Sequence, residues 1–304
     1  MKRVLIADKN QNRLASHIAQ SIGIDLIEVE TVRFADTEIK PLIDDNNKLS
    51  GSHAIIVHST SRPVNDHLIW LLLVCDILRL KHVKKISAII PYFGYGRQNM
   101  YTDGLQGAGY SVMRMLESAG IDELITIDLH APALQYATIS MKVHNIRLDS
   151  FIAECIAQKY EYKDLTIVAP DKGSAERAAY IAGYLNAPLI ERFKERIGVD
   201  NARLLSLSDT CKTERALIVD DIIDTGTTVL QVVQAISKSN VNCKIDLFAI
   251  HPVLSNNAAQ LLQNSCIDRV WVTDSIELDD QQLFEKLRIV NIGPLLVKAL
   301  HDLF

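Results

Sequence analysis

Short apolar runs alternate along the chain with longer stretches in which apolar residues recur at helical spacing. Seven runs have the length and continuity of buried strands: Val4–Ala7, Ala54–Val57, Ile86–Ile90, Leu124–Ile127, Leu165–Ala169, Ala216–Val219 and Ile245–Ile250. Helical spacing is found in Asn12–Ile22, His67–Leu80, Ser111–Ser118, Ser174–Leu185 and Val229–Ser237. Strands that are apolar on both faces and alternate with helices are typical of parallel sheets covered on both sides. The pattern therefore predicts an α/β fold with mainly parallel sheets flanked by helices.

A weak internal repeat suggests that this unit is present twice. A strand, a helix and a second strand follow one another in both halves, and each second strand ends near a proline, Pro91 or Pro252. The 304 residues would accommodate two domains, at roughly 150 residues each. Similar strand–helix–strand patterns recur by chance in any α/β chain. The pattern alone therefore does not decide between a duplicated domain and a coincidence.

Composition excludes several classes of function. The net charge is −5, which does not favour a nucleic-acid partner. The longest apolar run, Leu68–Cys75, is too short to span a membrane, and Val4–Ala7 is too short for the apolar region of a signal peptide. The five cysteines include no CxxC pair, which favours a reducing compartment. We therefore expect a cytoplasmic protein with no nucleic-acid or membrane partner.

The strongest chemical signal is the segment from Ala216 to Thr228, in which an apolar strand leads through an acidic turn into a helix. Its strand ends in Asp220 and Asp221, and its turn consists of Asp224, Thr225, Gly226, Thr227 and Thr228. Backbone N–H groups and hydroxyls at a helix N-terminus suit a phosphate, and a glycine lets the backbone approach it closely. The two strand-end carboxylates can accept hydrogen bonds from sugar hydroxyls and hold a hydrated Mg²⁺. The alternative is that these residues only cap the helix. One N-cap needs a single Asp or Thr side chain, however, and this segment has six such residues.

This segment resembles the phosphoribosyl-pyrophosphate-binding motif of the type I phosphoribosyltransferase fold, which serves transferases that consume this compound and the synthase that makes it. Further segments resemble the synthase: Arg33–Glu38, Ser59–Asp66, Pro91–Gln98, Asp128–Ala131 and Pro170–Arg177. The resemblance covers essentially the whole chain in order. The chain is therefore identified as a member of the ribose-phosphate pyrophosphokinase family.

The resemblance implies two tandem domains of the type I phosphoribosyltransferase kind. We expect an N-terminal domain over residues 1–145 on the ATP side and a C-terminal domain over residues 146–287 carrying the ribose 5-phosphate loop. Residues 288–304 should pack back on the first domain, and the amphipathic run Leu295–Phe304 fits a docked helix.

The resemblance also implies the reaction and its substrates. The family transfers the diphosphoryl group of ATP to the anomeric hydroxyl of ribose 5-phosphate, with Mg²⁺ as cofactor. ATP would be bound by Arg97 and Gln98, and by a loop of a neighbouring subunit that comprises Phe34, Asp36, Thr37 and Glu38. The protein should therefore be a homo-oligomer whose active site is completed across an interface. From the residues alone, Asp36 and Glu38 would be an acidic surface turn, and Phe34, Asp36 and Glu38 would share a face if the segment were extended.

The metal and catalytic residues are assigned by resemblance as well. His130 and Asp171, each just after an apolar strand, are assigned to Mg²⁺, although hard cations prefer oxygen ligands to imidazole. Lys194 and Arg196 match a Lys-x-Arg pair on the family's catalytic loop, and their charges would neutralise the transferring group. The residue between them, Glu195, is arginine in many members. The alternative for this stretch is a solvated charge run.

Two other functions remain open at the level of sequence. A phosphoribosyltransferase would consume the product on a nucleobase and would need no ATP site. An inactive paralogue would regulate a true synthase, although the presence of Lys194 and Arg196 argues against it.

Overall fold

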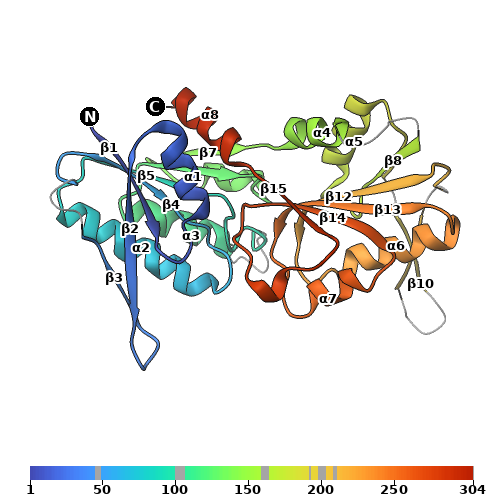
Figure 1. Ribbon diagram of the computed structural model, residues 1–304, viewed down its shortest axis with the longest axis horizontal. Helices are drawn as coiled ribbons and strands as arrows, with labels where there is room; N and C mark the ends of the chain where they lie inside the picture. The colour runs from blue at the N-terminus through green and yellow to red at the C-terminus, as the bar shows by residue number, and fades with distance from the viewer. Residues whose placement is uncertain are drawn as a thin grey trace. The chain divides into compact units, whose positions relative to one another are not determined.

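The computed structural model describes residues 1–44, 49–99, 107–158, 164–191, 193–197, 203–207 and 211–303. Figure 1 labels its helices and strands. In chain order these elements are β1 (Arg3–Asp8), α1 (Arg13–Ile22), β2 (Asp25–Arg33), β3 (Ile39–Leu42), β4 (His53–Val57), α2 (Val64–Leu80), β5 (Lys85–Ile90), α3 (Ala108–Ser118), β6 (Glu123–Ile127), η1 (Pro132–Tyr136), β7 (Lys142–Ile146), α4 (Asp149–Ala157), β8 (Leu165–Val168), α5 (Ala175–Leu185), β9 (Leu189–Ile190), β10 (Phe193–Ile197), β11 (Arg203–Leu207), β12 (Arg215–Ile223), α6 (Thr227–Ser239), β13 (Lys244–Pro252), α7 (Ala258–Gln263), β14 (Ile267–Thr273), η3 (Asp280–Gln282), β15 (Leu287–Val290) and α8 (Gly293–Leu303).

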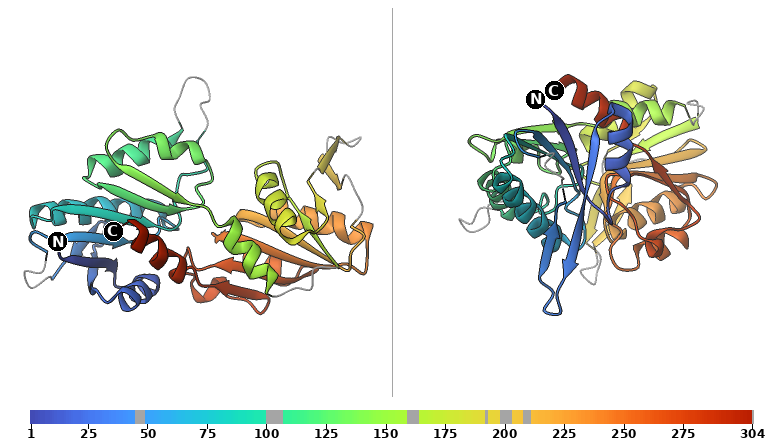
Figure 2. Two further views of the ribbon diagram at one scale, coloured as in Figure 1. Left: turned by 90° about the horizontal axis from the view of Figure 1, so that it is seen from above. Right: turned by 60° about the vertical axis from the view of Figure 1, so that its left-hand side comes forward.

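The chain forms two compact units. Unit 1 comprises Met1–Ile146, Ser275–Glu277 and Asn291–Phe304, and unit 2 comprises Arg147–Asp274 and Leu278–Val290. In unit 1 the C-terminal helix α8 lies beside α1, at the other end of the sequence (Figure 2).

Unit 1 is built on a seven-stranded sheet in the order β3-β2-β1-β4-β5-β6-β7. Its strands are parallel except for β3, which runs antiparallel to β2. Successive residues of β1 from Val4 to Ala7 are all fully buried, so both faces of the sheet are covered. The continuous apolar character of this strand follows from its place inside the sheet.

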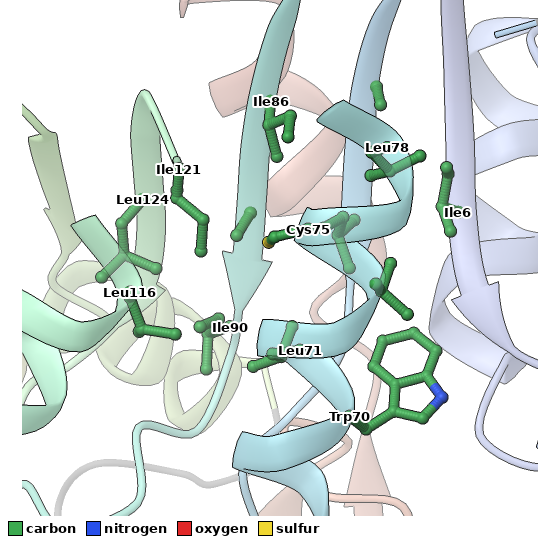
Figure 3. Close-up of a cluster of buried hydrophobic side chains, with 14 of the residues drawn as sticks. Ile6, Trp70, Leu71, Cys75, Leu78, Ile86, Ile90, Leu116, Ile121 and Leu124 are labelled. Atoms are coloured by element: carbon green, nitrogen blue, oxygen red, sulfur yellow. The ribbon is translucent and has the colours of Figure 1, made fainter. Parts of the chain in front are cut away.

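The core of unit 1 lies between this sheet and the helices α2 and α3. Figure 3 shows Leu71 and Cys75 of α2 on the side of Ile90 and Ile86 of β5, and Trp70 and Leu78 of the same helix on the side of Ile6 of β1. The indole of Trp70 donates a hydrogen bond from Nε1 to Oγ1 of Thr31 at 3.0 Å, so its polar edge is satisfied although the residue is only 2% exposed.

Unit 2 repeats the topology of unit 1. Its six-stranded sheet has the order β15-β14-β13-β12-β8-β9, with every pair parallel. When the six parallel strands of each unit are numbered along the chain, both sheets have the order 2-1-3-4-5-6. The repeat seen in the sequence thus has a structural basis, because the β4-α2-β5 unit and the β12-α6-β13 unit occupy equivalent places.

The α/β fold with mainly parallel, helix-flanked sheets is confirmed, and each of the seven expected strands is present. Strands with mixed burial were missed. β2 alternates buried and exposed positions, and no residue of β7 is fully buried, so neither produces a continuous apolar run. Several expected boundaries were wrong. β12 continues to Ile223 instead of ending at Val219, and α6 begins at Thr227 instead of Val229. α2 and α3 begin at Val64 and Ala108 instead of His67 and Ser111.

Among the residues that the structure describes, no helix is long and apolar enough to cross a membrane.

Candidate active site

Each sheet has one point where the chain changes its direction of winding. In unit 2 this point lies between β8 and β12, because β9 is added on one side of β8 and β12 on the other. Ligands of open α/β sheets bind beyond the carboxyl ends of the strands at such points. The predicted residues of unit 2 lie there: Asp171 follows β8, and the acidic segment ends β12.

Asp220 and Asp221 lie inside β12 and not after it. β12 pairs with β8 only as far as Ile218, whereas its pairing with β13 continues to Ile223. The carboxyl-terminal half of β12 therefore extends beyond the end of β8. Asp220 is 8% exposed and Asp221 is partly exposed, so one carboxylate is nearly enclosed while the other borders solvent.

Negative charge accumulates at this strand end. Burial raises the pKa of Asp220 well above its usual range, and the nearby carboxylates of Asp221 and Asp171 raise it further. The backbone N–H of Asp221 donates to Oδ1 of Asp220 at 2.9 Å and offsets part of this effect. Three carboxyl groups that repel one another at a ligand edge are typical of a site for a divalent cation or for several hydroxyl donors.

The N-cap position of α6 lies within the turn from Asp224 to Thr228. Gly226 is the N-cap residue, with φ of 77°, and glycine has no side chain that could cap the first turn. The left-handed φ explains why glycine occupies this position. The N-cap position is therefore not filled by an Asp or Thr side chain. The N–H groups of the first turn are thus directed toward a site that can hold an anion.

The hydroxyls around this turn face solvent. Thr225, Thr227 and Thr228 are exposed, and the Oγ1 atoms of Thr225 and Thr227 lie 3.1 Å apart. The N-terminus of α6 and the exposed hydroxyls thus lie beside the carboxylates of β12. This arrangement suits a sugar phosphate, which brings an anionic group and several hydroxyls together.

Asp171 organises its own loop. Its Oδ1 atom accepts hydrogen bonds from the backbone N–H of Ser174 at 3.0 Å and from the hydroxyl of Ser174 at 3.1 Å. These contacts fix the entry into α5 just beyond Ser174. Asp171 is exposed, and its carboxylate lies within electrostatic range of Asp220.

Lys194 and Arg196 lie on a two-stranded hairpin in unit 2. β10 pairs antiparallel with β11, with Lys194 opposite Ser206 and Arg196 opposite Leu204. The backbone of β11 lies beside α6, the helix that follows the turn Asp224–Thr228. Because β10 is a strand, the backbone is extended at the Lys-x-Arg pair.

The segment Phe34–Glu38 is a tight turn, not an extended strand. Phe34 N–H donates to the carbonyl of Glu38 at 2.9 Å, and Thr37 N–H donates to the carbonyl of Phe34 at 3.0 Å. Thr37 has a left-handed φ of 75°, and Asp36 Oδ1 accepts from the N–H of Glu38 at 3.2 Å. The segment is therefore not extended, so the condition under which Phe34, Asp36 and Glu38 would share a face is not met, and Asp36 and Glu38 lie in an exposed turn. The turn lies at the tip of the β2–β3 ribbon, which projects from unit 1 (Figure 1), and all of its side chains are exposed.

Sequence reasoning assigned no role to the residues that hold this turn. Arg33 donates from Nη1 to the carbonyl of Thr37 at 3.0 Å and forms an ion pair from Nη2 to Oδ2 of Asp66 at 2.5 Å. Arg33 therefore connects the turn to the first turn of α2. Arg33 and Asp66 both belong to segments that resemble the family, Arg33–Glu38 and Ser59–Asp66. This resemblance could have marked them as residues to consider.

Arg97 and Gln98 follow β5 and are exposed. Tyr95 has a left-handed φ of 65°, and its carbonyl accepts from the N–H of Gln98 at 2.9 Å, which shapes the turn. The carbonyl of Gln98 in turn accepts from the N–H of Gly109, near the start of α3. Phe93 is 5% exposed and belongs to the core, whereas Tyr95 is partly exposed and donates its hydroxyl to Asn65 at 2.7 Å.

His130 follows β6 in unit 1 and is exposed. The preceding residue Asp128 is 2% exposed with φ of 42°, and the N–H of Leu129 donates to Oδ1 of Asn145 at 2.9 Å. Within the described ranges, no group of three or more His, Cys, Asp or Glu side chains is arranged to hold a metal ion. Mg²⁺ does not require one, because it usually takes one or two carboxylates together with water and substrate phosphates.

Unit 1 has a cavity of about 260 Å³ at its own winding point, between β1 and β4. It is lined by residues that include Asp8, Thr31, Arg33, His58 and Trp70. None of the residues predicted for the site lines it. The equivalent loop after β4 is closed on the unit, because Thr60 donates its hydroxyl to the carbonyl of Tyr92 and accepts from the N–H of Gly94. It therefore differs from the turn Asp224–Thr228 of unit 2, where the threonine side chains are exposed.

Comparisons with known proteins agree with this arrangement. A family model described as the N-terminal domain of ribose phosphate pyrophosphokinase matches residues 3–120, and one described as a phosphoribosyl synthetase-associated domain matches residues 204–304. Ribose-phosphate pyrophosphokinase 2 of Enterococcus faecalis is 32% identical over 308 residues, covering 99% of this chain and 94% of that protein. Ribose-phosphate pyrophosphokinase of Bacillus subtilis is 32% identical over 305 residues, covering 98% and 93%. The crystal structure of phosphoribosylpyrophosphate synthetase from Mycobacterium smegmatis superimposes with a TM-score of 0.90 at 25% identity, covering 100% of this chain and 99% of that one.

Proposed function

Because this chain belongs to the ribose-phosphate pyrophosphokinase family, we propose that it transfers the diphosphoryl group of ATP to ribose 5-phosphate. The anomeric hydroxyl attacks the β-phosphorus, AMP leaves, and 5-phosphoribosyl 1-pyrophosphate is formed. The observation that carries the proposal is the start of α6 with glycine at its N-cap position beside the carboxylates of β12, within a chain similar to these enzymes over nearly its whole length.

Ribose 5-phosphate is bound by unit 2. The first-turn N–H groups of α6 and the hydroxyls of Thr225, Thr227 and Thr228 hold the 5-phosphate, while Asp224 and Gly226 shape the turn. Asp220 and Asp221 accept hydrogen bonds from the ribose hydroxyls. Binding is selective for a sugar phosphate because the acidic strand end repels an anion that carries no hydroxyl donors.

Lys194 and Arg196 act on the transferring group. Diphosphoryl transfer demands little covalent chemistry from the protein, and its rate depends on positioning and on neutralising charge. Two cations on one strand can offset the charge that develops on the phosphoryl oxygens. The proximity of β11 to α6 supports this role, because it brings the backbone of the hairpin near the helix that begins at the phosphate turn.

ATP is bound by residues of unit 1, with Arg97 and Gln98 on one subunit and the Phe34–Glu38 turn from a neighbouring subunit. The sheet order supports this division. β2, which carries the turn, and β5, which precedes Arg97, are three strand spacings apart, which amounts to about 14 Å. The projecting ribbon carries the turn farther from its own sheet (Figure 2). The protein is therefore a homo-oligomer.

Mg²⁺ is the cofactor, and the donor set fits it. Asp171 supplies a carboxylate oxygen of the kind that this ion prefers, and the repulsion between it and the nearby carboxylates of Asp220 and Asp221 would be relieved by a cation. His130 is the further candidate from unit 1, acting through water or the ATP phosphates. When bound, the ion neutralises phosphate charge and orients the diphosphoryl group.

ATP affinity separates this function from that of a phosphoribosyltransferase, which needs no ATP site. We expect isothermal titration calorimetry to detect ATP binding to the full chain in the presence of Mg²⁺. A protein that binds 5-phosphoribosyl 1-pyrophosphate and a nucleobase but not ATP would contradict the proposal.

Arg97→Ala should weaken ATP binding and leave ribose 5-phosphate binding unchanged, because the two substrates are assigned to different units. Calorimetric titration of each substrate measures this directly. Arg13→Ala is the matched control, since Arg13 is an exposed arginine at the start of α1 outside the proposed sites. Equal weakening of both substrates by Arg97→Ala would indicate a structural role instead.

A further inference from the structure

Two cysteine thiols are in contact in the core of unit 2. The Sγ atoms of Cys211 and Cys243 lie 3.5 Å apart, and both residues are buried, at 1% and 8% exposure. Cys211 comes just before β12, and Cys243 lies in the turn between α6 and β13. The two residues are distant in sequence, so no cysteine motif in the chain reveals the pair.

The backbone around the pair is held on both sides. The side-chain amide of Asn240 donates to the carbonyl of Cys211 at 3.2 Å, and the N–H of Cys243 donates to the carbonyl of Asn240 at 3.2 Å. The N–H of Lys244 donates to the carbonyl of Glu214 at 2.8 Å. Asn240 is thus hydrogen-bonded to the backbone of both cysteines, which holds the two backbone segments next to each other. A disulfide has an S–S length of about 2.05 Å, so its formation requires only a small side-chain rotation.

The two sulfur atoms are chemically unequal. The hydrogen bond from Cys243 lowers the pKa of Cys211, and the neighbouring hydroxyl of Thr213, with Oγ1 at 3.4 Å from Sγ, lowers it further. The same contact raises the pKa of Cys243. Cys211 is therefore the better nucleophile of the two.

We propose that Cys211 and Cys243 are a reversible redox pair, in which a hydroperoxide oxidises Cys211 and Cys243 then closes a disulfide. A small oxidant is required because neither sulfur is broadly exposed. The reaction uses neither of the proposed substrates, so it is independent of the transfer reaction.

The chemistry is a two-step oxidation. The Cys211 thiolate attacks one oxygen of hydrogen peroxide, the O–O bond breaks, and the sulfenic acid and hydroxide form, the latter taking up a proton to give water. The Cys243 sulfur then attacks the Cys211 sulfur, the S–O bond breaks, and a second water leaves with the thiol proton of Cys243. Two electrons pass from the two thiols to one peroxide, and a dithiol reductant such as dithiothreitol reverses the change.

The cross-link would close a covalent ring around the element that carries the phosphate turn. The ring runs from Cys211 through β12, the turn Asp224–Thr228 and α6 to Cys243. The disulfide lies at the amino end of β12, and the turn lies at its carboxyl end. Oxidation would thus restrain this segment without touching the residues assigned to substrates.

The test is a thiol map of the full reduced chain after a small molar excess of hydrogen peroxide. Free thiols are alkylated during unfolding, and the digested protein is analysed by mass spectrometry. We expect one linked peptide pair containing Cys211 and Cys243, lighter than the two reduced peptides by two hydrogens and restored by dithiothreitol. Cys75 should stay reduced, because burial raises its pKa to about 12.

Single variants identify the order of steps. In Cys243→Ser, a sulfenic-acid reagent such as dimedone should label Cys211, whereas in Cys211→Ser it should not label Cys243. Cys266→Ser is the control, since Cys266 is exposed and outside the pair. If Cys211 and Cys243 of the unaltered chain are both still alkylated after Cys266 has been oxidised, the proposal is wrong. That outcome does not depend on whether either variant folds.

Discussion

Replacing Lys194 by alanine is expected to lower kcat by about 10²–10³-fold, the effect of removing one group that stabilises a transition state. KM for ATP and for ribose 5-phosphate should change little, because the lysine is proposed to interact more strongly with the transition state than with bound substrates. Steady-state kinetics with each substrate varied in turn provide the measurement. A kcat within about threefold of the unaltered protein would remove Lys194 from the catalytic machinery.

The matched control for Lys194 is its neighbour on the same strand. Glu195 lies between Lys194 and Arg196 on β10, opposite Leu205 of β11. Because successive residues of a strand face opposite sides, Glu195→Ala should leave kcat nearly unchanged. If Glu195→Ala lowered kcat as much as Lys194→Ala, the effect would belong to the hairpin fold and not to the lysine charge.

The double substitution of Asp220→Ala with Asp221→Ala is expected to abolish measurable binding of ribose 5-phosphate. Both carboxylates are proposed to accept the ribose hydroxyls, and their removal leaves only the phosphate turn. The fold should survive, because the cluster is repulsive: the pKa of Asp220 is raised by burial and by Asp221 and Asp171. A group with a raised folded-state pKa stabilises the fold most below its unfolded pKa and loses that contribution as the pH rises through the folded pKa. Near neutral pH its removal should therefore cost little stability.

Calorimetry and circular dichroism together test this substitution. Glu214→Ala is the control, because Glu214 is an exposed carboxylate at the opposite end of β12. We expect ribose 5-phosphate to bind that variant normally. Unchanged affinity in a folded Asp220/Asp221 double variant would contradict the assignment of these carboxylates.

The sequence predicted the elements that are buried on both faces and missed those that are half exposed. β1, β4 and β5 lie inside the sheet of unit 1 and are continuous apolar runs. β2 has an alternating pattern interrupted by glutamates, so its identity as a strand depends on pairing with β1, which is a tertiary interaction. Seven strands could therefore be predicted from the apolar pattern. The duplication was left open by that pattern, and the half-exposed strands could not be predicted from it.

The candidate site divides in the same way. The turn Asp224–Thr228 could be identified from its residues, since glycine with hydroxyls before a helix has few other uses. The near-complete burial of Asp220 could not be predicted from the sequence. Asp220 lies in the part of β12 that continues beyond its pairing with β8, and the length of that part is known only from the structure. The tight turn at Phe34–Glu38 was missed for a related reason: it is held by Arg33, whose second partner Asp66 is distant in sequence.

Formation of AMP that requires both ribose 5-phosphate and Mg²⁺ is the most direct test of the proposed function. The purified chain is incubated with ATP, and AMP and 5-phosphoribosyl 1-pyrophosphate are quantified by chromatography, with each component omitted in turn. We predict equal amounts of the two products in the complete mixture and none when ribose 5-phosphate or Mg²⁺ is absent. Release of ADP in place of AMP, or AMP formation without ribose 5-phosphate, would contradict diphosphoryl transfer.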